Sequence, residues 1–334
     1  MKRLCAVLLV LISASAFAKG APQFDPAGDP AKLAATFLKS SKLIALGGVK
    51  RVAFSQFRVE FAVENSGKAS SSASAGFTSS KSDIKLIGIT DETRQAIADQ
   101  LYDELVKGLT GAGVEVVPYE TVSENERYKS MESILRRGQE PVGMQGGKSA
   151  FVGAHGTPYY FTNDDHHLGL GTALGGFSTV QPQNIEPRIA ETLDATVVRA
   201  TISVKFAEMD TRGGMFHTSS SVKTNEALAL VPEQTSFLFV TPGSGKARVD
   251  LVKTINMPGD AITLRDVTTK GEKTTEAITN AFSGLLGGGI HSVRHYEAVA
   301  EPDGYRALVS QYGIAMESAL MTVLQPAMSG AAKN

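Results

Sequence analysis

The chain has almost no cysteine and almost no net charge, and both shortages exclude classes of protein. Its single cysteine, Cys5, lies in the N-terminal apolar run, so the rest of the chain can carry neither disulfides nor a cysteine-linked lipid anchor. The 33 basic and 34 acidic residues nearly cancel, which gives no sign of a nucleic-acid-binding surface. The fold must therefore rest on an apolar core, which 334 residues can build.

Long apolar runs are scarce as well, and the N-terminal run is short. Lys2 and Arg3 are basic, residues 4–12 are apolar, and Ala16-Phe17-Ala18 has the small-x-small pattern that signal peptidase cuts. The apolar run has about nine residues, against the roughly 20 that span a bilayer. We expect residues 1–18 to be a cleaved signal peptide. Residues 19–334 should form one exported domain, periplasmic or secreted, without a transmembrane helix.

Hydrophobic spacing predicts an α/β fold with a mixed sheet. Apolar side chains alternate along residues 57–63, and a slip in this alternation after Phe54 indicates a β-bulge. Strands and helices alternate in the first half of the chain, and strands dominate residues 195–270. We therefore expect helices mainly on one face of the sheet, and β-rich excursions in the second half of the chain. Similar patterns predict helices over residues 30–38, 90–110, 123–137, 274–286 and 303–324, and strands over 52–63, 84–89, 114–119, 195–207, 215–224, 237–240, 248–255 and 261–267.

The best strand pattern predicts a sheet with one solvated face. Along residues 195–207, apolar side chains alternate with polar ones. The polar set is Arg199, Thr201, Ser203 and Lys205. Such alternation is typical of a sheet that packs on the core with one side only.

Two segments lack periodicity and are expected to be mobile loops. Residues 66–83 are low in complexity, and residues 139–186 are rich in glycine and irregular. Aromatic side chains in such loops can anchor a partner. The predicted partner-contact residues are Phe77, Tyr159, Tyr160, Phe161 and Phe177. Alternatively, the aromatic cluster at 159–161 pins its loop to the domain.

No catalytic, cofactor or metal motif passes a spacing test. Residues 242–247 resemble a phosphate loop but lack its first glycine and its hydroxyl, so they predict a turn. Asp164-Asp165-His166-His167 gathers metal-type ligands without a further spaced ligand, which leaves metal binding there open. His291 and His295 could share a helical face or lie on a strand. We expect no catalytic residue, no cofactor and no metal.

The order of elements resembles that of a known family. A strand at residues 52–54 leads to a helix ending at 101–109, then to a strand at 114–118 and a helix ending at 134–138. A later strand starts near Leu193 and is followed by Asp210-Thr211-Arg212-Gly213-Gly214. This order is similar to the periplasmic α/β domain of the curli secretion lipoprotein (CsgG-like) family and of TolB N-terminal-like domains. The resemblance implies an α/β fold and a binding or assembly role in the cell envelope, but no pore, and the lipid-anchor cysteine is absent.

These observations favour an exported, non-catalytic envelope protein that acts as a binding or assembly accessory factor. Its expected partner is another cell-envelope protein, and its oligomeric state is left open. A periplasmic carrier of lipids or small molecules is one alternative, which would need an apolar cavity of several hundred cubic ångströms. A hydrolase with an unrecognised site is another. A cavity holding His155, His166 or His295 beside a carboxylate would favour it.

Export predicts a defined N-terminus for the mature protein. N-terminal sequencing of the exported form should begin at Lys19, within a few residues, because the tripartite segment before it is removed. A mature form that retains residues 4–12 would contradict the prediction.

Overall fold

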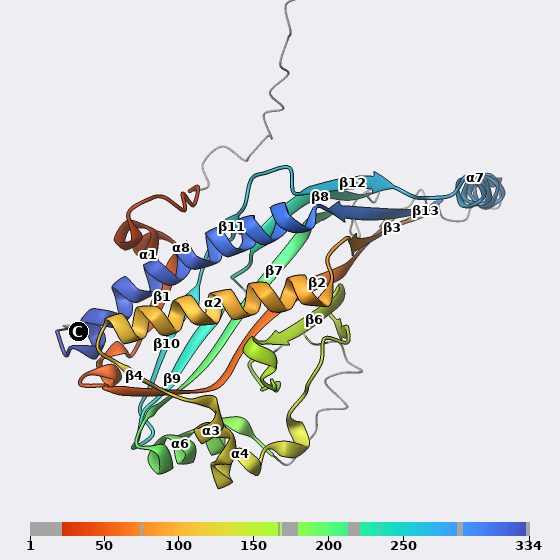
Figure 1. Ribbon diagram of the computed structural model, residues 1–334. Coiled ribbons are helices and arrows are strands. Elements are labelled where there is room, and N and C mark those ends of the chain that lie inside the picture. Colours follow the sequence, from red (N-terminus) through yellow and green to blue (C-terminus); the bar gives the residue numbers. More distant parts are fainter. Residues whose placement is uncertain are drawn as a thin grey trace, which may run out of the picture.

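The predicted fold class is confirmed by the computed structural model, an α/β protein with a mixed sheet (Figure 1). The structure describes residues 22–73, 76–165, 168, 180–212, 221–232, 234–285 and 290–331. The expected signal peptide, Phe177, His166 and His167 lie outside these residues.

The sheet is built around two long strands, β2 and β7 (Figure 1). Its strands are β1 (Leu38–Ser41), β2 (Arg51–Ala73), β3 (Gly76–Ile87), β4 (Glu115–Val117), β5 (Val142–Met144), β6 (Gly147–Gly153), β7 (Thr196–Arg212), β8 (Ser221–Leu230), β9 (Ser236–Val240), β10 (Lys246–Leu251), β11 (Ile255–Asn256), β12 (Ile262–Asp266) and β13 (Ile290–Ala300). The main path through the sheet is β1-β10-β9-β7-β2-β3-β13-β12. β2 runs parallel to both β4 and β7, β3 runs parallel to β13, and antiparallel pairs make up the remainder of this path.

Helices cover the sheet unequally. They are α1 (Pro30–Phe37), α2 (Asp91–Gly111), α3 (Tyr119–Glu124), α4 (Glu126–Lys129), α6 (Pro182–Leu193), α7 (Lys270–Leu285) and α8 (Pro302–Met328), with the 3-10 turns η1 (Leu43–Leu46), η2 (Glu132–Ile134) and η3 (Ala154–Gly156). The long helices α2 and α8 lie together across one face of the sheet, and α1 packs against α8 (Figure 1). The shorter α3, α4 and α6 gather near the start of β2 and β7 (Figure 1).

Helix starts follow local capping chemistry. Asp29 accepts a hydrogen bond from the Ala31 N–H at the start of α1, and α2 begins directly after Thr90, close to the predicted starts at residues 30 and 90. The single helix predicted over residues 123–137 is wrong, because the extended Asn125 ends α3 and caps the short α4. Helix α8 starts at Pro302, one residue before the predicted start, because the carboxylate of Glu301 caps it.

Residues 52–62 of β2 and 196–204 of β7 are buried on both faces, which corrects the predicted solvated face. Apolar side chains on one face pack under α2 and α8, and Ala53 and Val197 on the other pack with α3, α4 and α6. Arg199 is only 8% exposed and Ser203 only 1% exposed. The polar residues are covered because α6 packs over Arg199 and because the hydroxyl of Ser203 bonds Gln234.

Both segments predicted as irregular loops contain regular structure. Residues 66–83 continue β2 and β3 as one antiparallel hairpin, paired as far as Ala73 and Gly76. Residues 139–186 contain β5, β6 and the first residues of α6. The prediction that these parts are irregular was wrong for residues 66–73, 76–83 and 142–153, because hydrogen bonds to a neighbouring strand hold small polar residues in a ladder, whatever their own hydrophobicity. Residues 166, 167 and 169–179 of the second segment lie outside the described residues.

Helix α8 passes a test of length and composition for a membrane-crossing helix, which buried core helices pass as well. In the structure 61% of its most apolar stretch is buried, against α1, α2 and the sheet. This is the position of a core helix. At its crossing with α2, Gly313 lets the helices lie close together, since a Cβ there would lie 2.5 Å from Leu101 Cδ2 and would force that buried side chain to move.

One carboxyl group lies inside this helix pair. Glu317 of α8 is 2% exposed, and neither of its carboxyl oxygens has a hydrogen-bond partner among the described residues. Burial raises the pKa of Glu317 well above its ordinary value, and the nearby charge of Glu104 raises it further. Folding therefore favours the protonated form of this side chain.

Replacing Glu317 with glutamine should stabilise the protein at neutral pH. The folded pKa is raised, so the stabilisation by protonated Glu317 is complete below the unfolded value of 4.5 and is lost as pH rises toward the folded value. The melting-temperature gain of Glu317→Gln over wild type should be small near about pH 4 and grow toward about pH 8. Glu124→Gln, at an exposed position of α3, is the control. A gain independent of pH would contradict the prediction.

Candidate functional site

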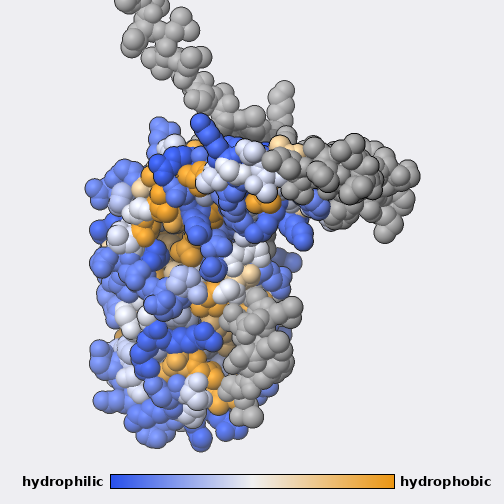
Figure 2. All heavy atoms as spheres, turned by 90° about the vertical axis from the view of Figure 1, so that its right-hand side faces the viewer, coloured by the Kyte–Doolittle hydropathy of each residue, from blue (hydrophilic) through white to orange (hydrophobic). Residues whose placement is uncertain are grey.

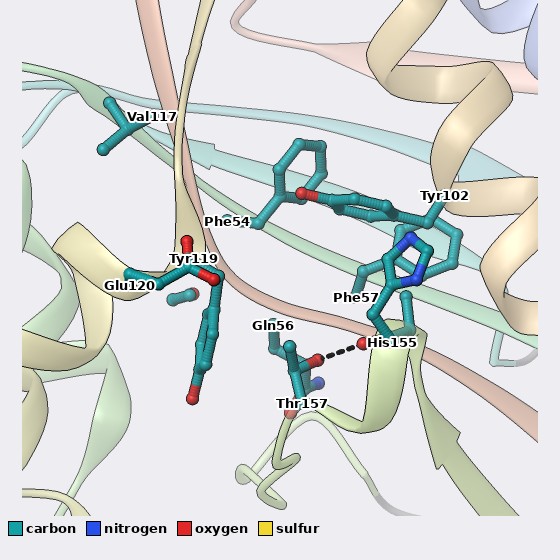
Figure 3. Close-up of a pocket in the computed structure, with 11 residues that line it drawn as sticks. Phe54, Gln56, Phe57, Tyr102, Val117, Tyr119, Glu120, His155 and Thr157 are labelled. Atoms are coloured by element: carbon teal, nitrogen blue, oxygen red, sulfur yellow. Dashed lines mark hydrogen bonds between the residues drawn. The ribbon is translucent and has the colours of Figure 1, made fainter.

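A gap in the pairing of β2 opens a cavity at the edge of the sheet. β2 pairs with β4 over Arg51–Ala53 and with β6 from Arg58 onward. Between these two partners, residues 54–57 carry the predicted bulge, seen as a register shift against β7 between Phe54 and Gln56. A cavity of about 270 Å³ lies at this gap (Figure 3).

Aromatic rings form most of the apolar wall of this cavity. Phe54, Phe57 and Tyr102 pack edge to face, with ring centres 5.2–6.3 Å apart. Tyr119 lies on the opposite side of the cavity (Figure 3) and packs edge to face on Tyr128. The wall therefore comes from three separate elements, β2, α2 and α3.

A strained turn places His155 at the rim. His155 has a φ of 51°, in the left-handed region that non-glycine residues rarely adopt. Two carboxylates of α2 hold it there: its N–H donates to Asp99 Oδ1 at 2.6 Å, and its Nε2 lies 2.8 Å from Asp103 Oδ1. Gly153 permits the turn, since a Cβ there would lie 1.9 Å from the Thr157 carbonyl oxygen.

Gln56 supplies a buried polar group to the cavity. Its side chain is 3% exposed, and its Oε1 accepts a hydrogen bond from the Tyr160 N–H at 2.7 Å. Its Nε2 has no hydrogen-bond partner among the described residues. A buried donor without a partner costs about 1–3 kcal/mol. Because this nitrogen has almost no accessible surface, a ligand could reach it only if a neighbouring side chain moved.

Tyr160 connects Gln56 to a network of buried charges. The Tyr160 carbonyl accepts a hydrogen bond from Arg58 Nη1 at 2.7 Å, and its hydroxyl lies 2.7 Å from Glu186 Oε1 and 2.8 Å from Ser55 Oγ. Burial raises the pKa of Tyr160 well above its ordinary value, and the charge of Glu186 raises it further. This tyrosine is therefore a neutral structural link.

On the face of the sheet that packs against α3, α4 and α6, two arginines form ion pairs with residues of other segments. Arg199 lies 3.2 Å from Glu186 and 2.9 Å from Asp164, and Arg58 is paired with Asp165. Burial alone would lower the pKa of Arg199, but Glu186 and the surrounding acidic groups keep it above its ordinary value. The guanidinium of Arg58 also lies about 5 Å from the rings of Phe151 and Phe161.

The cavity itself lies in an acidic environment. Burial raises the pKa of Tyr102, and the charges of Asp103 and Glu120 raise it further. Glu120 is exposed at the cavity rim, and Asp99 and Asp103 lie behind His155. Among the described residues that line the cavity, His155 has the only basic side chain.

The predicted partner-contact residues do not form an exposed surface. Tyr159 is 3% exposed and Tyr160 is fully buried, so the expectation that they are free anchors was wrong. They pack inward because Tyr159 and Phe161 stack around Phe151, and Tyr160 enters the charge network. The alternative, in which the cluster pins its segment to the domain, fits this geometry. The side chain of Phe77, like Phe177, lies outside the described residues.

The candidate metal residues have other partners. Asp164 and Asp165 form ion pairs with Arg199 and Arg58, which satisfies their charges without a metal ion. Among the residues that the structure describes, no group of three or more possible ligands is close enough to hold one. His291 and His295 lie on strand β13, and residues 242–247 include the predicted turn between β9 and β10.

Sequence reasoning missed the residues that line the cavity. Gln56, Tyr102, Tyr119 and His155 come from distant segments and share no motif spacing. The one usable signal was the slip in alternation between Phe54 and Phe57, which marks a bulge where the strand pattern is interrupted.

Removing one charge from the buried network should destabilise the fold. Glu186→Gln leaves the guanidinium of Arg199 with only the half-exposed Asp164 as a charged partner. We expect the free energy of unfolding, measured by denaturant titration, to fall by about 2 kcal/mol or more. Glu191→Gln, an exposed position on the same helix, should change it by less than about 0.5 kcal/mol. Equal effects of the two variants would contradict the assignment.

None of the protein-family models, curated proteins or solved structures compared with this chain matches it. The resemblance to the curli secretion lipoproteins thus rests on the order of elements alone. Any function assigned to the cavity has to come from the chemistry of its own side chains.

Proposed function

We propose that the protein is an exported, non-catalytic binding or assembly factor of the cell envelope, and that the cavity between β4 and β6 is its recognition pocket. The observation that carries this proposal is a cavity with aromatic rings on its walls and the exposed polar side chains of Glu120 and His155 at its rim. Pockets of this kind, apolar with a few placed polar groups, are typical of ligand recognition.

His155 beside two carboxylates is the one observation that favours a hydrolase instead. A general base needs a free nitrogen aimed at a nucleophile or a water. Here Nε2 lies 2.8 Å from Asp103 and Nδ1 lies 3.8 Å from Asp99, so both nitrogens face carboxylates. The cavity hydroxyls also point elsewhere: Ser55 and Thr157 donate to the backbone carbonyls of Val198 and Ala154. These contacts favour a positioning role for His155.

Two cavities of the described residues differ in size and polarity. The aromatic pocket, at about 270 Å³, is slightly smaller than the cavities that usually hold a lipid chain or a drug-sized molecule. A larger cavity of about 440 Å³ is lined by charged residues such as Glu60, Lys148 and Lys205, which do not suit an apolar cargo. The aromatic pocket suits one ring or one side chain of a larger partner, which is the mode expected of an accessory factor.

The shape of the molecule offers a second surface for a partner. Strands β3 and β13 extend beyond the helical layer and carry α7 away from the main body (Figure 1). The described surface on that side is largely hydrophilic with scattered apolar spots (Figure 2). An arm of this kind supports an assembly role alongside the pocket, in line with the resemblance to envelope proteins.

The proposal predicts that a pocket variant loses more binding than its loss of stability explains. Tyr119→Ala removes one pocket wall from a half-buried position, so capture of the mature protein on isolated cell envelopes should fall several-fold, whereas its melting temperature should fall no more than that of the control variant. Tyr296→Ala, half-buried on β13 and far from the pocket, is the matched control.

Catalysis is tested separately. If the purified protein hydrolyses generic ester or peptide substrates, and His155→Ala abolishes this, the non-catalytic proposal fails.

A further inference from the structure

We infer that the edge of the sheet at β1, together with η1 and the two ends of β10, docks on an anionic lipid surface. The inference goes beyond the proposed function, because the aromatic pocket lies at β2, and strands β10, β9 and β7 stand between β1 and β2. It is carried by the distribution of charge along the chain, by lysines without ion pairs, and by two exposed apolar side chains.

The charges of this nearly neutral chain are unevenly distributed. Residues 30–50 contain four lysines and no acidic residue, and they form α1, β1 and η1. Residues 234–249 contain Lys246 and Arg248 and no acidic residue, and they form β9 and most of β10. Two segments far apart in the sequence thus carry basic side chains without acidic neighbours along the chain.

Strand pairing brings the two segments together. All four residues of β1 pair with β10 in antiparallel register, so Lys42, which follows β1, lies near Lys246 at the start of β10. At the other end of β10, the Val252 N–H donates to the carbonyl of Phe37. This edge lies at the end of the molecule opposite α7 (Figure 1). We call its basic side chains the lysine edge: Lys39, Lys42, Lys246 and Lys253.

No ion pair neutralises the lysine edge. All four side chains are exposed, and none is within ion-pair distance of a carboxylate in the parts of the chain that the structure describes. Asp250 of β10 is bound instead by Arg248, whose Nε lies 2.6 Å from its Oδ1. On β12, β13 and α7, by contrast, Arg265, Lys273 and Arg294 all pair with carboxylates. The lysine edge therefore attracts an anionic partner, over about 8 Å at physiological salt.

Apolar side chains at the same edge favour a lipid bilayer over a soluble acidic partner. Ile44 of η1 is 66% exposed and Val252, after β10, is 42% exposed, and they are the most exposed large apolar side chains of the described residues. Ile44 is two residues from Lys42, and Val252 directly precedes Lys253. Proteins that bind a bilayer surface combine these features, with basic groups at the lipid phosphates and apolar side chains at the start of the acyl region.

A second copy of this chain suits the edge poorly. β1 is the last strand of the main path through the sheet, where pairing with a strand of another copy would occur. Exposed lysines on an edge strand oppose such pairing, because two copies would bring like charges together. An anionic surface meets no such repulsion.

Vesicle co-sedimentation of the mature protein tests the inference. One set of vesicles contains phosphatidylcholine alone, and the other is an equimolar mixture with anionic phosphatidylglycerol. The protein should bind the anionic vesicles at least about tenfold more tightly than the neutral ones, and added salt should weaken this binding. Absence of binding to the anionic vesicles, or equal binding to both sets, overturns the inference.

Two variants that lose the same charge locate the contact. The edge variant carries three changes at exposed positions: Lys39→Gln, Lys42→Asn and Lys246→Gln. Asparagine is chosen at position 42 because it tolerates the left-handed backbone there, with a φ of 54°. The control variant carries three changes at exposed lysines without ion pairs, on the β2–β3 hairpin and α7: Lys68→Gln, Lys85→Gln and Lys270→Gln.

The edge variant should bind anionic vesicles about tenfold or more weakly than the wild type, and the control variant less than about twofold more weakly. Equal effects of the two variants overturn the inference. Ile44→Ser gives an independent answer even if the edge variant fails to fold. It should weaken vesicle binding several-fold without changing its dependence on salt, because it removes apolar contact but no charge. If Ile44→Ser leaves binding unchanged, the edge recognises charge alone, as an acidic protein offers it, and the inference fails.

The proposed function is tested apart from the inference. If Tyr119→Ala lowers envelope capture while anionic vesicles do not bind, only the inference fails. If the vesicles bind through the lysine edge while Tyr119→Ala leaves envelope capture unchanged, the recognition role of the pocket fails and the inference stands.

Discussion

The structure depends on the burial of two arginines, Arg58 and Arg199, on the second face of the central sheet. Each guanidinium must meet a carboxylate, since an uncompensated charge at this depth would cost several kilocalories per mole. Pairing with Glu186 brings α6 onto the sheet, and pairing with Asp164 and Asp165 draws in the preceding segment. Tyr160 is fixed between these ion pairs, and its N–H then orients Gln56. The position of Gln56 beside the pocket therefore follows from the pairing of these buried arginines with carboxylates.

Much of the fold could be predicted from local sequence. Apolar alternation located β2, β7 and β9, and four-residue spacing located α2 and α8, because these elements bury one continuous stripe of side chains. Asp29 before Pro30 marked the first helix, for the reason that a short acceptor satisfies free N–H groups at a helix start. The bulge near Phe54 was visible too, since one extra residue breaks a period of two.

What could not be predicted depends on contacts between distant segments. Arg199 and Ser203 look solvent-facing in a strand pattern, and only the return of α6 and of the turn after β8 buries them. Small polar residues at 66–83 carry no strand signal of their own and are held by a partner strand. The pocket joins Gln56, Tyr119 and His155 from three regions of the chain. No local pattern encodes that meeting, and the left-handed turn at His155 runs against its residue type.

The bulge in β2 has a consequence for how the pocket could arise. One added residue lets Phe54 and Phe57 both join the core under α2, while Ser55 and Gln56 take up polar contacts away from it. Loss of a single codon here would restore plain alternation along β2 and close the register shift beside the pocket. The shape of this cavity is therefore separable from folding over evolutionary time. Descendants of one ancestor could keep the scaffold while gaining or discarding the pocket through an insertion or deletion of one residue.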